Sequence, residues 1–252
     1  MDDDPLILHQ FAISHFCEKA RWALDFKGLP WRANTLVPGL HVRTTRRLTA
    51  RRSVPVLSGG GAPAIGDSTA IVDALEERFP EPALAPAEPA LAAEARAWEE
   101  RLDERLGVAV RRLCHATLLD HRDVVLPLLV HGAPWYGRPL LRLAWPKLAP
   151  TMRRRFGVDA EQVARARADI DSTLDELAVA RDASGYLVGG RFTRADLTAA
   201  ALLAPLTREP LYPVPWTDPL PEPLRSDCER LAPDLAWVSA TYAAHRRPRR
   251  PG

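Results

Sequence analysis

A serine and a cysteine stand three positions apart in the segment ISHFCEKARWAL, residues 13–24. The spacing of Ser14 and Cys17 is that of a redox pair of cysteines, but a serine replaces the first thiol. A serine cannot form a disulfide, so dithiol chemistry is lost, whereas its hydroxyl can donate a hydrogen bond to a thiolate. An apolar run at residues 6–11 and the helical spacing of apolar residues that follows predict a strand and then a helix beginning near Ser14.

Three interpretations of this helix start are open on the residues alone. Ser14 activates a bound thiol, or Ser14 is an ordinary N-cap, or Cys17 is itself a nucleophile. A free thiol has a pKa near ~8.5, and one hydrogen bond to its anion lowers that pKa by about one to two units. A buried, inert thiol is the common state of a free cysteine one turn into a helix. The pattern therefore favours activation of a bound thiol over redox cycling.

Two further motifs lie in the first part of the chain. Val54-Pro55 opens the strand-like VPVL, where a proline is awkward at an interior ladder position. Either the peptide bond is cis and turns the Val54 backbone outward towards a ligand, or Pro55 is simply the first residue of the strand and needs no cis bond. Asp67 and Ser68 stand where a helix ending before Pro80 begins. They either cap that helix or, with its free N–H groups and positive dipole end, hold a charged group of a ligand.

The elements that must position these residues follow from periodicity. Residues 1–80 predict the order β-α-β-α-β-β-α, an α/β unit with a mixed sheet, and the proline-rich residues 81–90 predict a linker. Residues 91–245 predict an all-helical part, with helices at 91–113, 121–131, 159–182, 193–206 and 224–245 and no assignment for 132–150. Thr193 and Asp196 predict a capping box, and residues 246–252 a basic, solvated tail.

Composition limits the class of protein. The chain has 252 residues, 46% hydrophobic and 26% charged, and a net charge of +2, which favours a globular protein with neither a nucleic-acid nor a membrane partner. The three cysteines lie far apart in sequence, which fits a reducing cytosol and argues against a disulfide framework. No apolar run has the length of a membrane span, no signal-peptide pattern is present, and no residue set has metal-site spacing.

With four motifs in this order, the sequence resembles the soluble glutathione S-transferases, as a serine-type bacterial member. The motifs are SHFC, SVPVL, IGDS and GRFTRADL, and the resemblance is strong over residues 6–80 and 186–203 and weak over 118–158. It implies a thioredoxin-like N-terminal domain followed by an all-helical C-terminal domain. It also implies a cytoplasmic homodimer that uses glutathione as co-substrate and no metal.

The resemblance also implies roles for individual residues. Ser14 would hydrogen-bond the glutathione thiolate, and Val54, ahead of Pro55, would pair its backbone with the cysteinyl part of glutathione like an added strand. Ser68 would take the γ-glutamyl carboxylate and Asp67 the ammonium. Five further residues are candidates for the glycyl carboxylate: His41, Arg46, Arg47, Arg51 and Arg52.

The function implied is conjugation of the glutathione thiolate to a small electrophile, which would lie near the end of the long helix and near Trp135 and Tyr136. Two alternatives are open. One is a glutathione oxidoreductase or lyase that works through Cys17, and the other is a non-catalytic binding protein with the same fold. The sequence determines neither the electrophile nor whether the thiol is glutathione or another small thiol.

Overall fold

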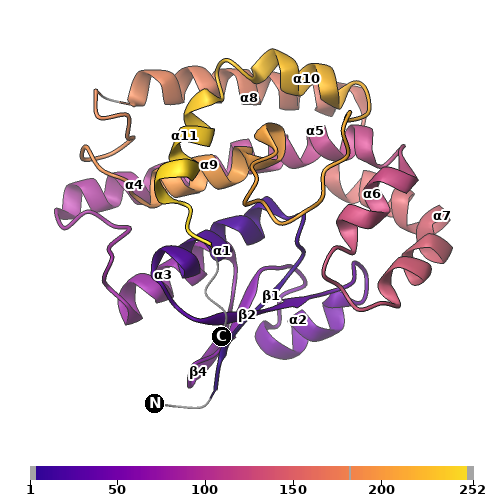
Figure 1. Cartoon of the computed structure of the whole chain (residues 1–252), viewed down its shortest axis with the longest axis horizontal. Coiled ribbons are helices and arrows are strands. Elements are labelled where there is room, and N and C mark those ends of the chain that lie inside the picture. The colour runs from indigo at the N-terminus through magenta and orange to yellow at the C-terminus, as the bar shows by residue number, and fades with distance from the viewer. Residues whose placement is uncertain (1–3, 182, 249–252) are drawn as a thin grey trace.

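The structure is a computed structural model that describes residues 4–181 and 183–248. Its N-terminal part is a four-stranded mixed sheet with three helices (Figure 1). The strand order is β2-β1-β3-β4. β1 (Leu6–Gln10) pairs in parallel with β2 (Trp31–Thr35) and antiparallel with β3 (Val56–Gly59), which pairs antiparallel with β4 (Ala62–Gly66). The helices are α1 (His15–Phe26), α2 (His41–Thr49) and α3 (Ser68–Arg78). The predicted thioredoxin-like unit is confirmed.

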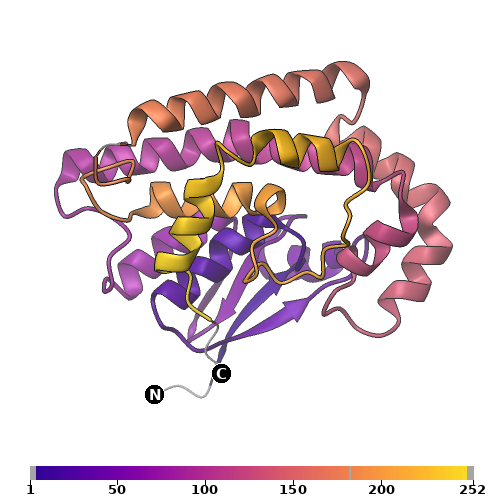
Figure 2. The same cartoon turned by 45° about the horizontal axis from the view of Figure 1, so that its top comes forward.

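The rest of the chain is mostly helical and covers one side of this unit (Figure 2). Its helices are α4 (Pro89–Arg101), α5 (Val108–Leu118), α6 (Arg122–Leu129), α7 (Gly137–Phe156), α8 (Ala160–Ala180), α9 (Arg194–Thr207), α10 (Leu224–Leu231) and α11 (Ala236–His245). A π-helical segment, η1 (Leu102–Gly107), joins α4 to α5. Residues 194–206 of α9 are all buried, and α9 packs on α1, so the contact of these two helices forms the centre of the molecule. The predicted helical second part is confirmed.

Three predicted helix boundaries differ from the structure. The helix expected over 91–113 extends to Leu118 and contains η1. Residues 132–150, left unassigned because proline normally interrupts a helix, mostly belong to α7, which continues through Pro146 and Pro150. The helix expected over 224–245 is two helices, α10 and α11, with Pro233 between them.

The capping box at the start of α9 is confirmed. The Thr193 hydroxyl accepts a hydrogen bond from the Ala195 N–H at 3.3 Å, and the Asp196 carboxylate accepts one from the Thr193 N–H at 2.9 Å. Asp196 also accepts from the N–H of Leu187 at 2.8 Å. The cap therefore fixes both the helix start and the loop that leads into it.

The segment predicted as a linker is packed rather than free. Leu84 is fully buried, and the Glu76 carboxylate of α3 accepts hydrogen bonds from the N–H groups of Leu84 and Ala85. The Leu84 carbonyl in turn accepts from the Arg194 N–H at 2.8 Å. These contacts tie residues 79–88 to both halves of the chain, and the predicted limits of the two domains stay a prediction.

The first residue of the predicted basic tail is not solvated. Arg246 is buried and forms ion pairs with Glu18 at 2.8 Å and with Asp25 at 2.6 Å, both on α1. The carbonyl of the preceding residue, His245, accepts from the Trp22 indole N–H at 3.3 Å. These contacts hold the end of α11 against the N-terminal unit. Residues 249–252 of the predicted tail lie outside the described residues.

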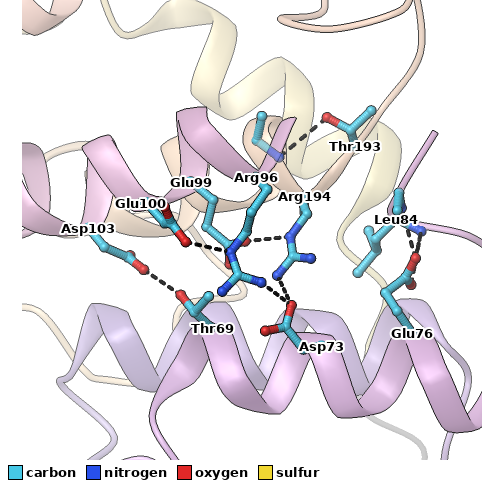
Figure 3. A network of polar contacts seen from close by, with 12 residues as sticks. Thr69, Asp73, Glu76, Leu84, Arg96, Glu99, Glu100, Asp103, Thr193 and Arg194 are labelled. Carbon is cyan, nitrogen blue, oxygen red and sulfur yellow. Dashed lines mark hydrogen bonds and ion pairs between the residues drawn. The ribbon is translucent and has the colours of Figure 1, made fainter. Parts of the chain in front are cut away.

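A polar network joins α3 to the helices above it (Figure 3), and Lys19 of α1 also belongs to it. The fully buried Lys19 ammonium lies 2.7 Å from Glu99 and 2.5 Å from Asp103. Asp103 also accepts from the Thr69 hydroxyl at 2.7 Å, and Arg194 of α9 forms an ion pair with Glu99. Because Thr69 lies in the first turn of α3, the network fixes where that helix begins.

In the part of the chain that the structure describes, no helix combines the length and the apolar character needed to cross a membrane.

Candidate functional site

Three of the four predicted motifs, those of Ser14, Val54-Pro55 and Asp67-Ser68, meet at one end of the sheet. β1 and β4 both run antiparallel to β3, so their carboxyl ends lie at the same end of the sheet. The helices α1 and α3 begin just beyond these strand ends. β3 starts at that end, with Val56 paired to His9 and to Gly66. Two helix N-termini, each with free N–H groups, and the residues that precede β3 are therefore brought together (Figure 1).

Val54 and Pro55 lie at the start of β3. Their peptide bond is cis, and the Pro55 carbonyl accepts a hydrogen bond from the Asp67 N–H at 3.2 Å, which ties this motif to the start of α3. Val54 is half-buried, and no described residue hydrogen-bonds to its backbone N–H or C=O. A donor and an acceptor on one residue are therefore available to an extended ligand backbone.

Ser14 is the N-cap of α1. Its hydroxyl oxygen accepts from the Cys17 N–H at 3.3 Å, and its own N–H donates to the Phe11 carbonyl at 3.1 Å. A serine hydroxyl has one donor and two acceptor positions, so accepting this bond does not use its hydrogen, which can be donated to the neighbouring Cys17 thiol or to a ligand. The N-cap role and the thiol-binding role, which the sequence left as alternatives, are therefore compatible in one side chain.

The loop that carries Ser14 is held from both halves of the molecule. The buried Arg21 guanidinium of α1 donates to the Ala12 carbonyl at 3.1 Å. The Tyr212 hydroxyl, from the loop after α9, donates to the Ile13 carbonyl. Backbone groups on both residues before Ser14 are thus fixed, which limits the positions its hydroxyl can take.

Cys17 lies on the first turn of α1 but is completely buried. Burial raises the pKa of its thiol, against smaller opposing effects of the Arg21 charge and of a hydrogen bond with Ser14. A thiol that is inaccessible and held protonated is a poor nucleophile.

Asp67 and Ser68 start α3 as expected. Asp67 Oδ1 accepts from the Thr69 N–H at 3.0 Å and more weakly from the Ala70 N–H at 3.4 Å, while Oδ2 lies 3.5 Å from the Arg51 guanidinium. Ser68 is buried, whereas the Asp67 side chain is 45% exposed. Asp67 therefore caps the helix with one oxygen and keeps the other accessible to a ligand.

The expected partners of a second ligand carboxylate are less favourably placed. Gly39 N–H donates to His41 Nδ1 at 3.1 Å, and Nε2 lies 3.1 Å from the Arg52 carbonyl, so both ring nitrogens are occupied. Burial lowers the pKa of His41, which keeps the ring neutral. The four candidate arginines, on and after α2, are all exposed: Arg46, Arg47, Arg51 and Arg52. Of these, Arg51 is already paired with Asp67.

The aromatic residues expected beside the second substrate point to solvent. Trp135 is 87% exposed and Tyr136 43% exposed, on the turn before α7. Two other rings lie beside Arg111, whose guanidinium carbon is 5.8 Å from the ring centroid of Phe16, near the start of α1, and 4.8 Å from that of Phe156. Nothing in the sequence signals this group, because its members come from α1, α5 and the end of α7.

His15, which follows Ser14, is a packing residue. It is buried, and its Nε2 lies 3.0 Å from the Gly107 carbonyl at the end of η1. Burial, assisted by the Arg111 charge, lowers its pKa to about 3, so the ring is neutral. A Cβ at Gly107 would lie 2.6 Å from the Phe16 ring, so only glycine lets η1 approach this closely without displacing the ring.

Across residues 4–181 and 183–248, no cluster of three or more histidine, cysteine, aspartate or glutamate side chains is arranged to hold a metal ion.

Comparison with protein families identifies the N-terminal unit. Residues 8–83 match the glutathione S-transferase N-terminal domain. No curated protein sequence matches the chain.

Solved structures share the fold over nearly the whole chain. The β-etherase LigF from Sphingobium sp. strain SYK-6 superposes with a TM-score of 0.68 at 22% identity, covering 96% of each chain. A glutathione S-transferase from Rhodospirillum rubrum F11 has a TM-score of 0.58 at 25% identity, covering 97% of this chain and 96% of its own. A theta class glutathione S-transferase from Xanthomonas axonopodis pv. citri, with glutathione bound, has a TM-score of 0.59 at 19% identity, covering 97% and 98%.

Proposed function

This chain carries a glutathione S-transferase N-terminal domain within the whole-length fold of those proteins, and from that premise we propose that it is a glutathione transferase. The thiolate sulfur of glutathione would form a bond to an electrophilic carbon of a small substrate as the bond from that carbon to its leaving group breaks. The leaving group, such as a halide, would depart with the electron pair, and the thiol proton would leave to solvent. The observation that carries the proposal is the meeting of Ser14, Val54 and Ser68 at one end of the sheet beside two helix N-termini.

Ser14 would be the catalytic residue. Its free hydroxyl hydrogen would donate to the bound sulfur and favour the thiolate over the thiol. A hydrogen bond to a charged group contributes roughly 1.5–3 kcal/mol, which lowers a thiol pKa by about one to two units. The N-terminus of α1 would add a further ~0.3–1 kcal/mol for a negative charge near its first turn. Together these effects would leave much of the bound glutathione ionised near neutral pH.

The remaining motifs would hold glutathione in place. The unpaired backbone groups of Val54 would receive the cysteinyl part in the manner of an added strand. The Ser68 hydroxyl and the N-terminus of α3 would take the γ-glutamyl carboxylate, and the accessible oxygen of Asp67 the ammonium. The proposal that the thiol is glutathione rests on this match. The γ-glutamyl end of glutathione carries both an ammonium and a carboxylate, which would meet the Asp67 carboxylate and the N-terminus of α3, respectively.

Calorimetric titration with glutathione and with S-hexylglutathione tests the proposal. We expect the wild type to bind both and Ser68→Ala to bind them at least about tenfold more weakly, since a buried hydrogen bond to a charge is lost. Ser226→Ala, at an exposed position on α10, is the matched control and should bind as the wild type does. A folded wild type that binds neither ligand would overturn the proposal and favour a scaffold protein or another thiol.

An ether is a second substrate class for the same site. The β-etherase LigF shares this fold at 22% identity, and its name denotes cleavage of an ether. The thiolate would attack the ether carbon, forming the carbon–sulfur bond as the carbon–oxygen bond breaks and the oxygen leaves with the electron pair. An aryl ether assayed beside an aryl halide distinguishes the two substrate classes through the product that accumulates.

The predicted homodimer and cytoplasmic location stay predictions. Light scattering, which measures the mass of the particle in solution, tests the homodimer.

A further inference from the structure

We propose that the electrophile conjugated at this site carries a carboxylate, and that the Arg111 guanidinium binds it between the rings of Phe16 and Phe156. The inference rests on the proposed transferase function and names the class of its second substrate, an anionic rather than a neutral electrophile. Arg111 would be a residue that determines specificity and not a participant in bond formation.

Arg111 is a partly buried cation without an anionic partner. Its Nε is buried and donates no hydrogen bond to a described neighbour, and no described carboxylate lies within ion-pair distance of its guanidinium. A buried guanidinium left without a counter-charge is destabilising by itself. Such a group is well suited to a ligand that supplies the missing charge.

The surroundings of Arg111 are positive. Burial lowers its pKa, and the charges of Arg112 and Arg155 lower it further, with no opposing acidic group. From Val124 to Val158 the sequence holds no aspartate or glutamate. This segment includes Arg155, at the end of α7, whose charge also lowers the pKa of His41 beside the Ser14 loop. Uncompensated positive charge of this kind attracts an anion and orients it.

The two rings suit the rest of such a molecule. Arg111 lies with its guanidinium carbon 5.8 Å from the Phe16 centroid and 4.8 Å from the Phe156 centroid. Arg112 Nε donates to the Phe156 carbonyl at 3.1 Å and so holds the end of α7 in place. Aromatic faces receive an apolar or aromatic frame, and a planar guanidinium binds a carboxylate through two parallel hydrogen bonds.

The position of Phe16 connects this group to the reacting atom. Phe16 lies two residues after Ser14, on the same first turn of α1, and the charge of Arg111 acts on the intervening His15. A substrate whose reactive carbon faces a sulfur bound at Ser14 would therefore extend its other end toward Arg111.

Two glutathione conjugates that differ in one group test the inference by calorimetry. S-(para-carboxybenzyl)glutathione carries the carboxylate, and S-(para-carbamoylbenzyl)glutathione has nearly the same shape without the charge. Both contain the same glutathione part, so its own carboxylates cancel in the comparison. We expect the wild type to bind the carboxylate conjugate about tenfold to a hundredfold more tightly, and Arg111→Gln to remove that preference.

Arg181→Gln is the matched control. The Arg181 guanidinium also stacks on a ring, 4.6 Å from that of Trp237, and its Nε is also buried without a partner. Unlike Arg111 it has an acidic neighbour, because the Asp196 charge favours its ionised form. It lies just beyond the far end of α8, a helix of 21 residues. The control should keep the full preference for the carboxylate conjugate.

The outcomes separate the inference from the proposed function. Equal binding of the two conjugates by the wild type, or a preference that survives in Arg111→Gln, would overturn the inference alone. Failure of both conjugates while glutathione binds would also overturn it, because the ring site would then not exist. Failure of glutathione itself would overturn the proposed function and the inference together. If Arg111→Gln does not fold, Arg111→Met, which also removes the charge, replaces it with the same expectation, and a wild type without the preference already decides the question.

Discussion

The hydroxyl of Ser14 has two uses that do not compete. It accepts the Cys17 N–H at the start of α1, which is the task of an N-cap, and its own hydrogen remains for a ligand. The helix cap also fixes the rotamer of the side chain before any ligand arrives. A residue that looks structural on the sequence is therefore already oriented for the chemistry we assign to it.

Cys17→Ala tests the oxidoreductase or lyase alternative at the residue scale. The thiol is fully buried and its pKa is raised by burial, so we expect kcat/KM for conjugation to stay within about twofold of the wild type. The free energy of unfolding should fall by roughly 1 kcal/mol, because a small buried group is lost. Steady-state kinetics and urea denaturation measure the two effects. A loss of activity of a hundredfold or so in a folded Cys17→Ala would mean that the thiol takes part.

His15 predicts a specific dependence of stability on pH. Its folded pKa is lowered to about 3, whereas the ring in the unfolded chain titrates near ~6.5. Between these values the unfolded chain binds the extra proton, so stability rises with pH and is lost as the pH falls from about 6.5 toward about 3. In His15→Gln the thermal midpoint should vary less steeply with pH over that window. Identical slopes for the two proteins would contradict a buried, neutral His15.

At the scale of elements, the π-helical segment η1 brings the long helix against the start of α1. A methyl group at Gly107 would lie 2.6 Å from Phe16 and 3.2 Å from Leu202, while the Gly107 φ of −61° suits any residue. Gly107→Ala should therefore displace the Phe16 ring at a cost of about 1–3 kcal/mol. We expect KM for the electrophile to rise severalfold with glutathione affinity unchanged. If KM does not change, Phe16 does not contact the second substrate.

Elements set by local signals could be predicted from the sequence. The caps at Ser14, Asp67 and Thr193 each place a side-chain oxygen before an apolar helical repeat, and each is found at the start of its helix. The fold of the first part followed from strands and helices of ordinary length in a recognisable order.

Elements and groups set by tertiary contacts could not be predicted. α7 continues through Pro146 and Pro150, which local rules treat as breaks, and packs against α5 and α6. Arg246 pairs with Glu18 across most of the length of the chain, so no sequence pattern distinguishes it from a solvated tail. The group around Arg111 has the same origin, because three distant segments supply it.

At the scale of the molecule, the polar network of Figure 3, together with Lys19 of α1, joins the two halves of the chain. Lys19 is fully buried between Glu99 and Asp103, and its removal would leave buried carboxylates undercompensated. Lys19→Met should lower the free energy of unfolding by about 3–5 kcal/mol. It should also weaken glutathione binding, because Thr69, a partner of Asp103, lies in the first turn of α3. Urea denaturation and calorimetry measure the two effects.

An exposed pair supplies the control for this prediction. Arg165 and Glu161 pair along α8 with side chains 64% and 71% exposed, and such pairs contribute at most about 1 kcal/mol. Arg165→Met should therefore leave stability and ligand affinity nearly unchanged. If Lys19→Met costs no more than Arg165→Met, the network does not hold the two halves together.

The pKa of the bound glutathione thiol is the most direct test of whether Ser14 activates that thiol. It is measured by ultraviolet titration of the thiolate in the wild type, Ser14→Ala and Ser14→Thr. We expect the wild type to lower this pKa by about one to two units from the free value near ~8.5. Ser14→Thr should keep the lowered value, and Ser14→Ala should return it close to the free value, with the loss of the N-cap costing stability separately. A Ser14→Ala protein that binds glutathione with the same lowered thiol pKa would contradict the central claim that Ser14 activates the thiol.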